Sequence, residues 1–129
     1  MLPKALIVED EPNTRALLRK LVESEGVVVD EAADGERALE LLDRNGYGVI
    51  LLDIALPKLS GAEVMEHLSA RNARALERVI VVTGLNIDEI RALFPSVCQA
   101  LSKPVIPKRL MESVRKCLRA PTDRQFTTL

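Results

Sequence analysis

The sequence predicts a single α/β domain built on a parallel β-sheet with helices on both faces. Short apolar runs alternate five times with segments of helical periodicity, and this strict strand–helix order is typical of parallel sheets with right-handed crossovers. Several of the runs are apolar throughout, as expected for strands covered on both faces. A chain of 129 residues is long enough to bury a core of its own.

The elements can be placed in order along the chain. Five strands are expected near residues 4–9, 27–31, 48–53, 78–83 and 98–102. Five helices are expected near residues 12–25, 35–45, 61–72, 87–94 and 107–119. The second and fifth strands have mixed composition, so we place them at the sheet edges. The domain then covers residues 1–119, and residues 120–129 are expected to form a disordered C-terminal tail.

Three of the helices carry particular signals. The first helix is expected to be amphipathic, with one apolar face made of Leu17, Leu18, Leu21 and Val22. Pro107 suits the first turn of the last helix, where its missing N–H is not needed. Pro95 ends the fourth helix early because proline disfavours a helical conformation at the preceding residue. The fourth helix is therefore expected to be short.

Composition limits the possible functions. The sequence has no apolar stretch near the roughly 20 residues that span a bilayer and no signal-peptide pattern, so we expect a cytoplasmic protein without membrane contact. Aromatic residues make up 2% of the chain, which argues against a base-stacking surface for nucleic acid. Residues 1–63 are net acidic and residues 64–129 net basic. The two cysteines, Cys98 and Cys117, are expected to be separate buried apolar side chains rather than a disulfide.

Polar side chains follow four of the predicted strands at the point where each strand ends. Glu9 and Asp10 follow the first strand and Asp53 the third, while Thr83 and Lys103 follow the fourth and fifth. Because parallel strands end at the same edge of the sheet, these groups should share one pocket. Two carboxylates about 4 Å apart repel each other by about 4 kcal/mol at an effective dielectric constant of 20. The cluster therefore needs positive charge, which Lys103 and a divalent cation would provide.

These residue types indicate phosphoryl chemistry. Oxygen ligands, several retained waters and a nearby phosphate suit a hard cation such as Mg²⁺. A carboxylate beside a cation, a lysine and a hydroxyl can attack a phosphoryl group and form an acyl phosphate. Asp53 is the best candidate nucleophile because it stands alone after a central strand. Glu9 and Asp10 are adjacent and better suited to holding the metal.

The motifs together resemble the receiver domain of two-component response regulators. The resemblance covers about residues 1–119, and the complete set in this order is highly specific although no single motif is. The matching segments are Val8-Glu9-Asp10-Glu11-Pro12, Ala33-Asp34-Gly35, Leu51-Leu52-Asp53, Leu56-Pro57-Lys58-Leu59-Ser60-Gly61, Val82-Thr83 and Lys103-Pro104.

The resemblance implies a flavodoxin-like, doubly wound five-stranded parallel sheet of order 2-1-3-4-5 with five helices. It implies that Asp53 is the phosphoacceptor and that Thr83 and Lys103 contact the phosphoryl oxygens. It also implies a cis peptide bond between Lys103 and Pro104. In such a domain Mg²⁺ is bound by Glu9, Asp10, Asp53 and the backbone carbonyl of Ala55.

The expected phosphoryl donor is a phosphohistidine on a sensor histidine kinase or on a histidine phosphotransfer protein. The resemblance implies a signalling domain that catalyses only its own phosphotransfer and dephosphorylation, not an enzyme with an independent substrate. A downstream protein partner or effector domain is expected, but the sequence does not identify it. We expect no direct binding of nucleic acid by this chain.

One position departs from the family. Receivers usually carry Tyr or Phe three residues before the lysine, whereas this chain has Ala100. An alanine has no rotamer to switch, so signalling is expected to use the loop and helix that follow Thr83, or another surface. Ala100 keeps open the alternative of a pseudo-receiver, an interaction module that is not phosphorylated. A nucleotide-binding enzyme is disfavoured because no glycine-rich loop follows the first strand.

Overall fold

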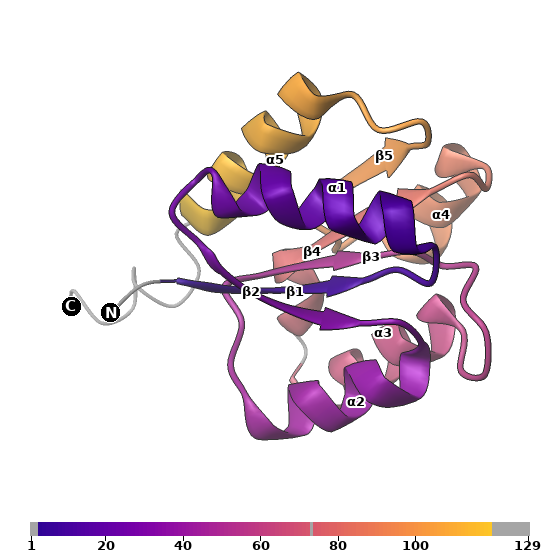
Figure 1. Ribbon diagram of the computed structural model, residues 1–129. Coiled ribbons are helices and arrows are strands. Elements are labelled where there is room, and N and C mark those ends of the chain that lie inside the picture. Colours follow the sequence, from indigo (N-terminus) through magenta and orange to yellow (C-terminus); the bar gives the residue numbers. More distant parts are fainter. Residues whose placement is uncertain (1–2, 73, 120–129) are drawn as a thin grey trace, which may run out of the picture.

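The five strands form one parallel sheet in the computed structural model, which describes residues 3–72 and 74–119 (Figure 1). The strand order is β2-β1-β3-β4-β5, and every pair is parallel. The sheet order and the edge positions of β2 and β5 are therefore confirmed. The strands are β1 (Lys4–Val8), β2 (Val28–Ala32), β3 (Val49–Leu52), β4 (Val79–Thr83) and β5 (Gln99–Ser102).

The predicted helices are also present, each within about two residues of its expected bounds. They are α1 (Pro12–Glu23), α2 (Gly35–Arg44), α3 (Gly61–Arg71), α4 (Ile87–Leu93) and α5 (Pro107–Arg119). A short 3₁₀-helix, η1 (Ala75–Arg78), which the sequence analysis did not predict, precedes β4. Residues 120–129, predicted to be a tail, lie outside the described residues.

The helices cover the two faces of the sheet and form two separate cores. Helices α1 and α5 pack on one face, and the buried residues there include Leu18 and Val114. Helices α2, α3 and α4 contribute to the core on the other face, which includes Val64 and Ile90. Alternate residues of each central strand point into the two cores, because successive side chains of a strand face opposite sides. The central strands β1, β3 and β4 are almost completely buried, as the continuous apolar runs predicted.

Side-chain caps fix where several helices begin, and these starts lie beside the carboxyl ends of the strands. Ser60 and Glu63 form a reciprocal capping box at the start of α3. Asp34 caps α2 and Asn86 caps α4 by accepting hydrogen bonds from backbone N–H groups. Each cap satisfies N–H groups that the first turn of a helix leaves without partners. The loops at this edge of the sheet are therefore anchored at their helix ends.

Two predictions about individual residues are wrong. Leu17 was placed on the buried face of α1, but its residue is 43% exposed. The buried residues of α1 are Leu18 and Val22. The face of the helix that packs on the sheet is therefore narrower than the four predicted residues. Cys98 and Cys117 are joined by a disulfide bond between the segment before β5 and the last turns of α5.

Among the described residues, no helix is long and apolar enough to cross a membrane.

Candidate functional site

The structure brings the predicted acidic residues together at the carboxyl end of the sheet. Glu9 and Asp10 follow β1, and Asp53 follows β3, which lies beside β1 in the sheet. One carboxylate oxygen from each residue lies within 4.8 Å of the others. Glu9 is 1% exposed and Asp53 is 5% exposed, whereas Asp10 is exposed at the rim. Two of the three carboxylates are therefore buried side by side, at a high electrostatic cost unless positive charge is near.

Lys103 supplies that positive charge. Its Nζ lies 2.8 Å from Oδ2 of Asp53 and 2.7 Å from Oε1 of Glu9. The backbone holds the lysine in place, because the Lys103 N–H donates to the carbonyl of Thr83 over 2.9 Å. The next peptide bond, Lys103-Pro104, is cis, as the resemblance implied. One ammonium group thus bridges the two buried carboxylates.

The pKa values follow from burial and from this bridge. Burial is the main cause that raises the pKa of Glu9 above its usual value, and the Lys103 ammonium opposes part of that rise. Burial alone would lower the pKa of Lys103, but its hydrogen bond to Asp53 and its close contact with the Glu9 carboxylate raise it above its usual value. Lys103 therefore stays charged at neutral pH. The site thus combines three carboxylates with a single lysine, which is held in its cationic form.

The donor set fits a hard divalent cation. Three carboxylates provide oxygen ligands within reach of one another, as Mg²⁺ prefers. The buried Oε1 of Glu9 has no hydrogen-bond donor among the described residues, although the Lys103 ammonium lies close by. The Asp53 carboxylate is held from two sides, by the Ala55 N–H at 3.0 Å from Oδ1 and by Lys103 at Oδ2. The residues present therefore suit Mg²⁺, which the sequence predicted, while the Ala55 carbonyl as a ligand stays a prediction.

Thr83 is fully buried at the end of β4. Its hydroxyl oxygen accepts a hydrogen bond of 3.3 Å from the N–H of Leu85, in the loop before α4. Ala100 pairs with Val81 in the β4–β5 register and is buried. Arg91 of α4 donates to the Ala100 carbonyl over 3.3 Å, so the backbone of this position connects α4 to β5.

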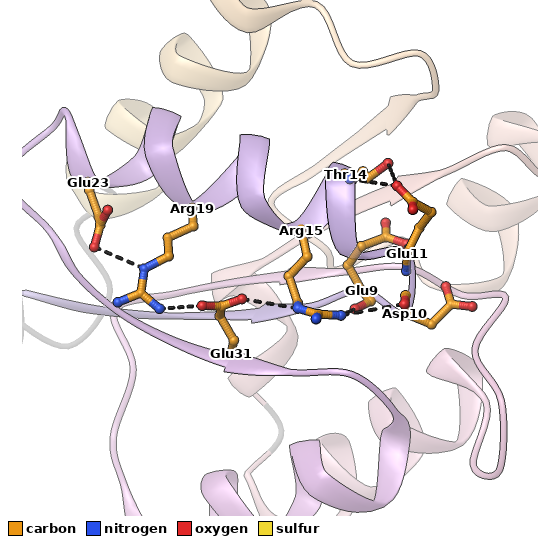
Figure 2. Close-up of polar contacts among 8 residues, drawn as sticks. All are labelled: Glu9, Asp10, Glu11, Thr14, Arg15, Arg19, Glu23 and Glu31. Atoms are coloured by element: carbon orange, nitrogen blue, oxygen red, sulfur yellow. Dashed lines mark hydrogen bonds and ion pairs between the residues drawn. The ribbon is translucent and has the colours of Figure 1, made fainter.

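Two residues that the sequence did not single out support the acidic turn, which is formed by Glu9 and Asp10 after β1. Arg15 of α1 donates to the backbone carbonyl of Glu9, and Glu31 of β2 accepts from Arg15 (Figure 2). Neither belongs to a motif quoted above. Glu31 is one of two adjacent acidic residues on the edge strand β2, and its charge in a strand was the available signal. Its partner depends on how α1 crosses β2, which a local sequence pattern does not give.

Comparison with known proteins identifies the family. A sequence model of the response regulator receiver domain matches residues 5–115. An uncharacterized 14.6 kDa protein of Leptolyngbya boryana is 34% identical over 121 residues, covering 92% of each chain. Regulator of RpoS from Escherichia coli K12 is 40% identical over 114 residues, covering 88% of this chain and 34% of that protein.

A solved structure agrees with this fold. The response regulator protein TrrA from Thermotoga maritima, in complex with Mg²⁺-BeF, superposes with a TM-score of 0.80 at 29% identity. The match covers 90% of this chain and 99% of that one. Fold and site thus define a phosphoacceptor signalling domain. The chain belongs to the response regulator receiver family of two-component signal transduction.

Proposed function

We propose that Asp53 is the phosphoacceptor of this receiver, with a phosphohistidine as the donor. One observation carries the proposal: Asp53 is buried after the central strand β3 and pairs with Lys103 at 2.8 Å. Its neighbours at the strand ends are the acidic turn and the hydroxyl of Thr83. The other acids of the cluster are adjacent to each other after β1, where they suit metal binding better than attack.

In the proposed reaction a carboxylate oxygen of Asp53 attacks phosphorus, and a new O–P bond forms. The N–P bond of the phosphohistidine breaks, and its electron pair returns to the imidazole nitrogen. Lys103 then interacts with a phosphoryl oxygen, and the hydroxyl of Thr83 donates a hydrogen bond to another. Positioning and charge neutralisation provide most of the catalysis in such a transfer.

Glu9, Asp10 and Asp53 would hold Mg²⁺, with the Ala55 carbonyl as a fourth ligand. When bound, the ion would neutralise negative charge on the oxygens of the transferred group. The magnesium–beryllofluoride complex of the Thermotoga maritima relative supports this assignment. The chain's own contribution is to hold two buried carboxylates beside one lysine.

Receiver domains of two-component systems interact with histidine kinases. We propose a sensor histidine kinase or a histidine phosphotransfer protein as the donor, within the cytoplasm. The domain would catalyse only its own phosphotransfer and dephosphorylation. Because the chain spans 34% of one curated relative and 92% of another, its downstream partner or effector stays open.

Intact mass measurement tests the proposal. The protein is incubated with magnesium chloride and acetyl phosphate, and a gain of one phosphoryl group of about 80 Da is expected. Asp53→Asn should abolish the gain, and so should the omission of magnesium. Asp88→Asn, which changes an exposed aspartate of α4, is the matched control and should be labelled like the wild type.

A missing adduct has two readings that a second measurement separates. Binding of beryllofluoride at the same site, followed by NMR, would indicate an acceptor whose phosphoryl group hydrolyses quickly. Absence of both the adduct and the beryllofluoride complex would contradict the proposal. Labelling of Asp53→Asn at the wild-type level would also contradict it.

A further inference from the structure

Arg15 of α1 reaches across to the backbone of the acidic turn. Its Nη1 donates to the carbonyl of Glu9 over 2.9 Å and lies 3.4 Å from the carbonyl of Asp10. Its Nε donates to the Glu31 carboxylate over 3.0 Å. One planar guanidinium group therefore connects the turn that carries two acids to the edge strand β2 (Figure 2).

Together with two other hydrogen bonds, the Arg15 contact holds the backbone and the side chain of Glu9 in place. The Glu9 N–H donates to the carbonyl of Ala32 over 3.0 Å, which continues the β1–β2 pairing. Its Oε2 accepts from the N–H of Glu11 over 3.1 Å. With its carbonyl bonded to Arg15, Glu9 has only Oε1 without a hydrogen bond, and that atom faces Lys103.

Asp10 depends on the turn more strongly. Among the described residues, its carboxylate has no hydrogen-bond or ion-pair partner, so its position depends on the backbone of the turn. The contacts of Arg15 with the two carbonyls hold that backbone. They also leave the carboxylates, rather than the carbonyls, free to face a cation.

Glu31 accepts from the Nε of Arg15, while the Nη1 of the same guanidinium contacts the turn. It lies on β2 in register with Ile7, on the sheet face that α1 covers. Arg19, one turn after Arg15, pairs with the same carboxylate and also with Glu23. Figure 2 shows Arg15 between Glu31 and the turn, with Arg19 on the other side of Glu31, between Glu31 and Glu23. The two arginines thus share a partner, but only Arg15 contacts the turn.

We infer that Arg15 is a positioning residue that orients Glu9 and Asp10 for Mg²⁺, with Glu31 as its anchor. This inference rests on the proposed function of the site. Groups that orient metal ligands are commonly worth a 10- to 100-fold change in affinity. Arg15 does not itself touch the cation.

The direction of the change in Mg²⁺ affinity distinguishes a positioning role of Arg15 from a purely electrostatic one. Arg15→Met removes a positive charge near a cation site, and Coulomb's law alone predicts tighter Mg²⁺ binding. Loss of positioning predicts weaker binding instead. Arg15→Lys keeps the charge but lacks the planar fork that bonds the carbonyl and the carboxylate at once.

The test is a titration with magnesium chloride, followed by the amide NMR signals of Glu9, Asp10 and Asp53. We expect Arg15→Met and Arg15→Lys to bind about tenfold more weakly than the wild type. Arg19→Met, the matched control, should stay within about twofold because it loses half-exposed ion pairs and no contact with the backbone of Glu9 or Asp10. Glu31→Gln, which keeps Arg15 but weakens its anchor, should shift the affinity in the same direction by a smaller factor.

Unchanged or tighter binding by Arg15→Met would overturn the inference. So would wild-type binding by Arg15→Lys, or an Arg19→Met defect as large as that of Arg15→Met. Labelling with acetyl phosphate at saturating magnesium is measured separately. A wild type that binds magnesium in an Arg15-dependent way but neither gains the phosphoryl adduct nor binds beryllofluoride would refute the proposed function and leave the positioning role intact.

Discussion

At the scale of single residues, one ammonium group bridges two buried carboxylates. Lys103 lies within 2.8 Å of both Glu9 and Asp53. Lys103→Met should destabilise the metal-free protein by about 3 kcal/mol, because both carboxylates lose their buried partner. Added magnesium should restore part of that loss, since a ligand that binds only the folded state stabilises it. Urea unfolding with and without magnesium measures both effects.

Lys58→Met is the matched control. Lys58 pairs with Asp34 at 3.5 Å, but its side chain is 61% exposed, so the change should cost less than about 1 kcal/mol. Magnesium should then stabilise this variant as much as the wild type. Equal destabilisation by the two lysine variants would show that Lys103 does not carry the charge balance of the site.

A second residue-scale prediction concerns Tyr47, which precedes β3, and Asp30 of β2. The buried Tyr47 hydroxyl donates to Asp30 over 2.7 Å, and this bond is the main cause that lowers the pKa of Asp30. Tyr47→Phe should reduce the free energy of unfolding by about 1 kcal/mol at pH 7. The pKa of Asp30 should rise toward its usual value in this variant.

The pH dependence follows from the direction of that shift. A carboxyl group with a lowered pKa in the folded state contributes stability above its unfolded pKa of 3.8. The contribution is lost as pH falls through the lower, folded-state value. The stability difference between wild type and Tyr47→Phe should therefore shrink below pH 4. Urea unfolding at several pH values tests this, and a difference that grows in acid would contradict it.

At the scale of elements, the sequence predicted most of the architecture because its signals are local. Continuous apolar runs mark β1, β3 and β4, and proline and capping residues mark helix ends. The site residues were predictable for the same reason, since each follows a strand directly. The Arg15–Glu31 contact was not predictable, because it depends on how α1 packs across β2. The disulfide was missed because Cys98 and Cys117 meet only once α5 folds back beside β5.

The start of α3 offers an element-scale prediction. A Cβ atom at Gly61 would lie 2.3 Å from the carbonyl oxygen of Asp53 and 2.6 Å from Cα of Ile54. Gly61→Ala must therefore move the backbone that carries the phosphoacceptor. We expect a loss of about 1–3 kcal/mol in stability, together with slower labelling by acetyl phosphate.

Gly46→Ala provides the control, because a Cβ at Gly46 has no heavy atom within 4 Å. Its stability should change by less than about 1 kcal/mol, and its labelling should match that of the wild type. Thermal unfolding and the time course of the intact mass would be compared for both variants. Normal labelling by Gly61→Ala would mean that the loop after β3 adapts without disturbing Asp53.

At the scale of the whole molecule, the disulfide ties the last helix to the sheet. Cys98 precedes β5 and Cys117 lies near the end of α5, 19 positions later in the chain. Helix α5 also pairs with the turn after α1, where Glu25 lies 2.8 Å from Arg115. Closing a loop of this length restricts the unfolded chain and is worth about 3 kcal/mol. Reduction should lower the free energy of unfolding by about that amount.

Reduction should not slow phosphorylation, because the ion pairs of Lys103 depend on the β4–β5 pairing rather than on the disulfide. Urea unfolding and acetyl phosphate labelling, each with and without a thiol reductant, measure the two effects separately. The double variant Cys98→Ala/Cys117→Ala is the control, and its stability should not respond to the reductant. A reducing compartment would keep the thiols apart, so a cytoplasmic receiver would work in the less stable form. Two free thiols in the denatured, air-oxidised protein would contradict the bond itself.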